Sequence, residues 1–168
     1  MDDRPVDRAF ADRDAFESDE ESYVAASTPF EAEAEAVRRA NRWRLRVQVT
    51  VPTLDAAVAG EDVGDAVANG WFETLSLRLE DAYDVIRSNG ATEPPTTERD
   101  EDAGEIRVQF AFETTDPRRG VDDAAAIVDF VEGTYVQGVI PGYEYDGPVG
   151  QLVRRARRAG GDPTVERE

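Results

Sequence analysis

The chain has 168 residues, 40% of them apolar, which is enough for a single buried core. Its 37 acidic residues outnumber 19 basic residues, all of them arginine, and the formal net charge is −18. Because cysteine, histidine and lysine are absent, the composition excludes disulfides, thiolate or histidine catalysis, Schiff-base chemistry and the usual zinc ligands. We therefore expect no cofactor.

Membrane insertion is also not expected. The longest unbroken apolar run covers residues 124–128, far short of the roughly 20 residues that span a bilayer. No apolar signal segment follows Met1. We therefore expect a cytoplasmic protein without a membrane partner.

The N-terminal part begins with helical spacing. Val6, Phe10 and Phe16 predict a short amphipathic helix over residues 5–17, which the acidic segment 18–22 ends. From Tyr23 onward the pattern is typical of β-strands.

The clearest unit is a hairpin of strands 30–37 and 42–51, in which apolar and charged residues alternate. A four-residue turn at 38–41 would place Glu35 opposite Arg44 and Glu33 opposite Arg46. Opposite charges across a sheet stabilise it by a few tenths of a kcal/mol per pair. We therefore interpret these charged rows as ion pairs rather than as a binding stripe.

The rest of the chain alternates helices and strands. A turn capped by Thr53 and Asp55 precedes a long helix over residues 63–86, which Asn89-Gly90 would end as a left-handed cap. The remaining predictions are an edge strand or extended loop at 91–99, a strand at 106–112, a helix that begins at Asp116-Pro117, and a final helix at 148–158.

These elements predict an α+β fold with one antiparallel sheet of about five strands and helices packed on it. The order is helix, three strands, helix, two strands, helix, and an extra C-terminal helix. We expect a single domain over residues 5–158, with disordered ends at 1–4 and 159–168.

One acidic cluster is spaced for chemistry. Glu80, Asp81 and Asp84 lie three and four residues apart, so on a continuous helix they share one side and could hold magnesium or transfer a proton. A magnesium-dependent or carboxylate enzyme is therefore an alternative. We favour a solvated helix face, because such clusters arise by chance in a chain this acidic.

The densest basic group lies near the C-terminus. Arg154, Arg155, Arg157 and Arg158 could contact the phosphates of a nucleic acid, which makes a nucleic-acid-associated factor a second alternative. Cations in the last turn of a helix also complement its dipole. We favour this structural role, and expect no nucleic acid as partner.

The most distinctive local group is aromatic. Tyr135, Tyr143 and Tyr145 accompany the turn Pro141-Gly142, and aromatic residues on such turns often serve as binding hot spots. The competing interpretation places the rings in the core, against Trp43 or Trp71.

Several segments resemble a haloarchaeal family of uncharacterised proteins: residues 51–58, 70–74, 79–83 and, above all, 131–145. The resemblance covers roughly residues 6–153 and implies a cytosol of molar potassium chloride, in which an acidic surface remains hydrated. Separately, the order of elements resembles type III secretion chaperones, small proteins that bind other proteins and often dimerise. We therefore expect a non-catalytic protein-binding or regulatory module, whose partner is another protein or a second copy.

Overall fold

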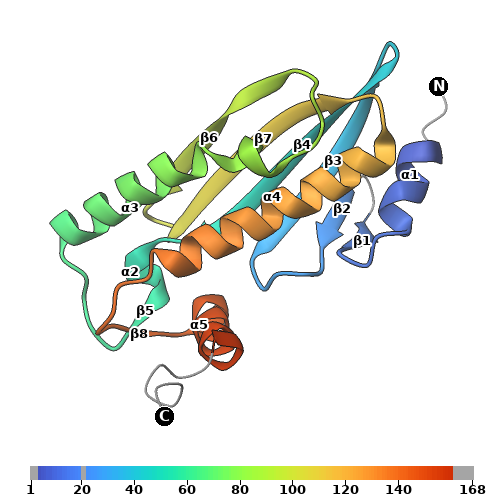
Figure 1. Cartoon of the computed structure of the whole chain (residues 1–168). Coiled ribbons are helices and arrows are strands. Elements are labelled where there is room, and N and C mark those ends of the chain that lie inside the picture. Colours follow the sequence, from blue (N-terminus) through green and yellow to red (C-terminus); the bar gives the residue numbers. More distant parts are fainter. Residues whose placement is uncertain (1–3, 20–21, 161–168) are drawn as a thin grey trace.

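The computed structural model describes residues 4–19 and 22–160. A six-stranded antiparallel sheet has helices on one face (Figure 1). Its strand order is β1-β2-β3-β4-β7-β6. The strands are β1 (Phe16–Asp19), β2 (Ser22–Ala25), β3 (Glu31–Arg39), β4 (Arg42–Pro52), β6 (Thr92–Asp100) and β7 (Glu105–Thr114). The predicted α+β class with one main antiparallel sheet is confirmed.

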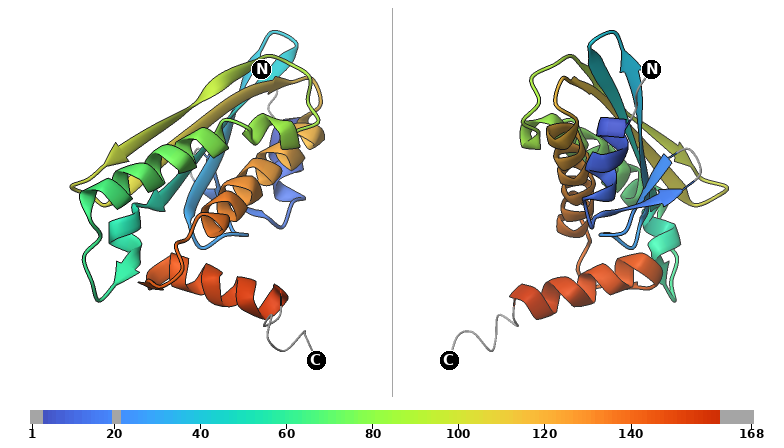
Figure 2. Two further views of the ribbon diagram at one scale, coloured as in Figure 1. Left: turned by 60° about the vertical axis from the view of Figure 1, so that its left-hand side comes forward. Right: turned by 90° about the vertical axis from the view of Figure 1, so that its right-hand side faces the viewer.

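The helical layer crosses the sheet. It consists of α1 (Arg4–Ala11), α3 (Asp65–Leu79), the 3₁₀ helix η1 (Ala82–Val85) and α4 (Pro117–Gln137). The helix α4 packs on β4 and between α1 and η1, and Figure 2 shows this layer from two further directions. At one end of the molecule lie α2 (Leu54–Ala57), α5 (Gly147–Gly160) and a small sheet of β5 (Val58–Ala59) with β8 (Glu144–Tyr145).

The alternation of β4 explains which face is covered. Every second residue of this central strand is buried under the helices, and its neighbours point to the opposite, polar face. The buried residues are Trp43, Leu45, Val47, Val49 and Val51. The predicted division of this strand into a buried and an exposed face is therefore confirmed.

The predicted register of the hairpin formed by β3 and β4 is wrong by two residues. Glu35 lies opposite Arg46 rather than Arg44, and Glu33 lies opposite Gln48. The turn has two residues instead of four, because Ala40 adopts a left-handed conformation with φ 55° that closes the chain tightly. A shift of two residues leaves every side chain on its predicted face.

The N-terminal helix is shorter than predicted. It ends at Ala11, and Phe16 begins β1, a strand that sequence patterning missed and that pairs with β2. Phe10 stacks on Tyr23 at 4.0 Å between ring centroids and meets Phe16 edge-on at 5.2 Å. These rings join α1 to the edge of the sheet. Of the ends expected to be disordered, 1–4 and 159–168, residues 1–3 and 161–168 lie outside the described residues, whereas Arg4 belongs to α1 and residues 159–160 belong to α5.

The long predicted helix divides in two. The helix α3 begins at Asp65 and ends at Leu79, and the separate turn η1 follows. The predicted left-handed cap at Gly90 is wrong, since Gly90 has no positive φ. Glycine is required at position 90 for another reason, because the backbone there lies close to Glu113. A Cβ at Gly90 would lie 2.4 Å from the Glu113 carbonyl oxygen.

The pairing of the edge strand β6 is irregular, and the side chain of Tyr83 stabilises it. Its pairing with β7 shifts between Glu93 and Thr96, where two prolines cannot donate backbone hydrogen bonds. The Tyr83 hydroxyl occupies this interruption: it accepts from the Ala111 N–H at 3.0 Å and lies within hydrogen-bonding distance of the Ala111 and Glu93 carbonyl oxygens. Burial raises the pKa of Tyr83.

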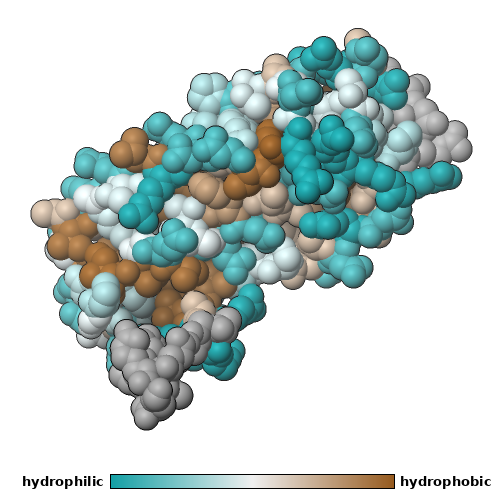
Figure 3. All heavy atoms as spheres, viewed as in Figure 1, coloured by the Kyte–Doolittle hydropathy of each residue, from teal (hydrophilic) through white to brown (hydrophobic). Residues whose placement is uncertain are grey.

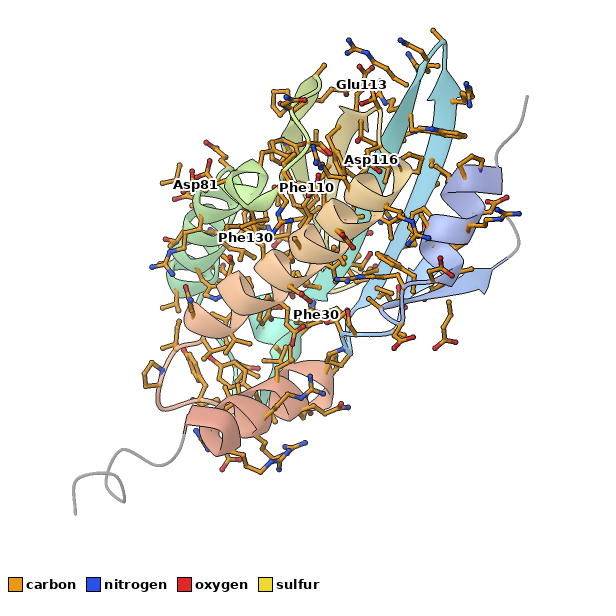
Figure 4. The ribbon with its side chains drawn as sticks, turned by 45° about the vertical axis from the view of Figure 1, so that its right-hand side comes forward. Phe30, Asp81, Phe110, Glu113, Asp116 and Phe130 are labelled. Carbon is orange, nitrogen blue, oxygen red and sulfur yellow. The ribbon has the colours of Figure 1, made fainter. Side chains whose placement is uncertain are left out.

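Two predicted caps are confirmed. Thr53 accepts from the Ala56 N–H at the start of α2, and Asp116 accepts from the Arg118 and Arg119 N–H groups. Figure 4 labels Asp116 at the start of α4. Further along α4, the buried Asp123 carboxylate accepts three hydrogen bonds from the segment that follows η1. These bonds fix that segment to α4.

Candidate functional site

A groove of about 480 Å³ runs between α3 and the C-terminal end of α4. Its volume lies within the roughly 300 to 1,000 Å³ typical of ligand pockets. Apolar side chains dominate its lining, with Val67, Trp71 and Leu75 contributed by α3 and Ile140 by the segment after α4. We consider this groove the candidate site, because it lies between two helices and apolar side chains dominate its lining.

Trp71 and Leu75 form the floor of the groove. They are 8% and 4% exposed. The Trp71 indole N–H donates to the Gly138 carbonyl oxygen at 3.2 Å, and its ring meets the Tyr135 ring edge-on at 5.3 Å. This hydrogen bond joins α3 to the end of α4, so the floor is a fixed surface.

The mouth of the groove exposes apolar surface. Val67, which lines the groove, is 42% exposed, and Leu77, on the same helix but outside the lining, is 66% exposed. Figure 3 shows hydrophobic side chains gathered at this end of the molecule, over the start of α3 and the end of α4. Contiguous apolar surface of this kind marks interaction sites in soluble proteins.

Tyr145 holds the far wall of the groove in place. Its hydroxyl accepts from the Ile140 N–H at 2.8 Å and donates to the Ile140 carbonyl oxygen at 3.1 Å. Burial raises the pKa of Tyr145, so the hydroxyl keeps the proton that it donates. Tyr145 therefore positions Ile140, which lines the groove.

The rim of the groove has one cationic group. Arg78 lies at the C-terminal end of α3, is exposed, and forms no ion pair with any residue in the described ranges 4–19 and 22–160. A guanidinium on the edge of an apolar groove can pair with a carboxylate of an incoming chain.

The structure divides the predicted aromatic group. Tyr135 is 1% exposed and its hydroxyl donates to the Pro52 carbonyl oxygen at 2.9 Å, so it belongs to the core and is inaccessible to a partner. Tyr143 and Tyr145 are partly buried against the core, whereas Pro141 and Gly142 are exposed. Gly142 has φ 101°, a conformation that requires glycine.

Neither of the two predicted charged clusters lines the groove. Arg154, Arg155, Arg157 and Arg158 are exposed on α5, where Arg155 lies 3.8 Å from Glu132.

The predicted shared helix face of Glu80, Asp81 and Asp84 is wrong, because α3 ends before Glu80. All three side chains are exposed, and Figure 4 shows Asp81 beside the turn between α3 and η1. Among the described residues, no group of acidic side chains is arranged to hold a metal ion.

Comparison with known proteins places the chain in a family. Residues 11–155 match the family of unknown function DUF5813. The chain belongs to this family. No curated protein and no solved structure matches it. Within the described part of this DUF5813 protein, no helix has the length and hydropathy needed to cross a membrane.

Sequence reasoning missed the groove of this DUF5813 protein. The prediction was one long helix over residues 63–86 without a groove, whereas the structure leaves Val67 at the mouth of the groove. One available signal was the series Ala66, Gly70 and Thr74, three small residues four apart on α3. Small side chains at such spacing leave a shallow surface beside a buried tryptophan.

Proposed function

We propose that this protein is a non-catalytic binding module that takes an amphipathic helical segment of another protein into the groove between α3 and α4. The observation that carries the proposal is the groove itself, with the Trp71 and Leu75 floor and the exposed Val67 at its mouth. Grooves between helices receive the apolar faces of partner helices. The proposed setting is the cytoplasm of a salt-adapted cell.

The chemistry of the partner follows from the lining. Apolar side chains of the partner would contact Trp71, Leu75 and Ile140, and an acidic residue would pair with Arg78. A hydrophobic contact is favoured in this setting, because high salt screens charge while apolar burial retains its strength. A chaperone-like role, in which the groove holds a segment of a client protein, agrees with this chemistry.

Site-specific photo-cross-linking tests the proposal. A photoreactive residue at position 67 faces the mouth of the groove, and one at the exposed position 122, in the N-terminal part of α4, is the matched control. We expect a discrete cross-linked partner from position 67 in extracts of the source cell, with the bond mapped to a helical segment that contains an acidic residue. Equal products from both positions would contradict a groove-specific partner. A product of twice the chain mass of 18.5 kDa would instead indicate a second copy.

A further inference from the structure

The open face of the sheet contains a second, polar hollow of about 190 Å³. It lies over β4 and β7, on the side opposite the helices, where the alternate residues Arg44, Arg46 and Gln48 emerge. Ala111 lies directly opposite Arg46 on β7. Because its side chain is only a methyl group, it leaves the space that longer side chains surround.

Each of the two arginines that line the hollow forms an ion pair with a glutamate. Arg46 lies 3.7 Å from Glu35 on β3, whereas Arg44 pairs with Glu93 on β6. The two arginines therefore have acidic partners on different neighbouring strands, β6 and β3. The Arg44 side chain is only 22% exposed, so it lies low in the hollow. Each guanidinium has five N–H donors, and its glutamate leaves most of them available.

The floor offers both donors and acceptors. The Gln109 amide N–H donates to the Gln48 amide oxygen at 2.8 Å, which leaves the Gln48 amide group as a donor and the Gln109 oxygen as an acceptor. Glu33 lies across from Gln48 and forms no ion pair with another described residue. Cationic and anionic groups are thus available within one small space.

We propose that this hollow binds a small zwitterion of amino-acid size, whose carboxylate pairs with Arg44 and Arg46 and whose ammonium group pairs with Glu33 and Glu35. The volume is below the roughly 300 Å³ at which pockets for larger organic ligands begin, which matches a molecule of this size. Arginine binds carboxylates in a bidentate manner, and carboxylates accept strong hydrogen bonds from ammonium groups.

Charge sets an order of preference among such ligands. Two arginines against Glu33, Glu35 and Glu93 leave one net negative charge around the hollow, within a strongly acidic molecule. One extra unit charge at about 6 Å in water changes the interaction by roughly 0.7 kcal/mol, or about threefold in affinity. L-Lysine should therefore bind more tightly than L-glutamine, and L-glutamine more tightly than L-glutamate.

Titration followed by nuclear magnetic resonance tests the proposal on the full chain. We expect L-lysine to shift the side-chain amide signals of Gln48 and Gln109 in a saturable manner. L-Lysinamide, which lacks the carboxylate, and Nα-acetyl-L-lysine, which lacks the α-ammonium group, should bind at least about tenfold more weakly, as expected for the loss of one charge-assisted interaction. Unchanged amide signals with L-lysine, or equal affinities for the blocked ligands, would overturn the proposal.

Variants localise the binding. Arg46→Gln removes an exposed cation and Ala111→Leu fills the hollow, so each should weaken L-lysine binding at least about tenfold. The matched control is Arg107→Gln, which removes an arginine from the same face of β7 outside the hollow and should leave affinity unchanged. Amide spectra establish that each variant is folded. Wild-type affinity in folded Arg46→Gln and Ala111→Leu proteins would refute the site.

Discussion

Replacing Asp123 with alanine should destabilise the protein by about 3 to 5 kcal/mol. The carboxylate is 2% exposed and accepts from the Arg87 and Ser88 backbone N–H groups, each at 2.8 Å, and from the Ser88 hydroxyl at 2.5 Å. Hydrogen bonds to a charged group contribute about 1.5 to 3 kcal/mol each. Because the three share one acceptor group, their loss is less than additive.

Urea denaturation measures this loss directly. The midpoint should fall with little change in slope, and the melting temperature should fall by about 10 °C for a chain of this length. The matched control is Asp122→Ala, the adjacent residue, which is exposed and lies 3.4 Å from Arg13. It should cost less than about 1 kcal/mol. Equal stabilities for the two variants would refute the argument that Asp123 fixes the segment after η1 to α4.

Four further results are expected. Tyr83→Phe should cost about 1 to 3 kcal/mol in urea denaturation, because the Ala111 N–H loses its acceptor. Burial raises the pKa of Tyr135 above its ordinary value, so the folded state keeps a proton that the unfolded state releases, and the melting temperature should fall as the pH rises above about 10. Burial also raises the pKa of Glu132, so stability from this group is greatest below about pH 4.5 and is lost as the pH rises through the folded pKa. Glu132→Gln should therefore raise the melting temperature at pH 7. Raising potassium chloride from about 0.1 M to about 2 M should increase stability by circular dichroism, whereas an unchanged melting temperature would contradict self-repulsion.

The hairpin of β3 and β4 illustrates how far patterning predicts this fold. Alternation has a period of two, so it identifies which residues are buried, and Ala34 and Leu45 are buried as predicted. A register shift of two residues preserves that pattern, so only the turn geometry at Ala40 distinguishes the alternatives. The four-residue strand β1 was missed because Phe16 was included in the predicted helix, although it lies six residues after Phe10 and therefore off the face that Val6 and Phe10 share.

The candidate site was less predictable than the fold. Tyr135 was named as a candidate binding residue, with a place in the core as the competing interpretation. Its depth in the core depends on contacts with Phe30 and Trp71 from distant segments. The groove likewise depends on the distance between α3 and α4, which no local pattern specifies. The role of Tyr145 in holding Ile140 follows only from the folded loop.

The change Gly70→Leu most directly tests the claim that the groove binds the partner segment. It should stabilise α3 and fill the groove. A Cβ at Gly70 would meet no atom within 4 Å, and Gly70 lines the groove. Gly133→Leu is the matched control, since this helical glycine has equal space but does not line the groove. Both variants should gain up to about 1 kcal/mol in stability from helix propensity. With the partner segment identified by cross-linking, calorimetry should show affinity reduced at least about tenfold for Gly70→Leu and unchanged for Gly133→Leu. Equal affinity of the wild type and Gly70→Leu would contradict the groove as the binding site.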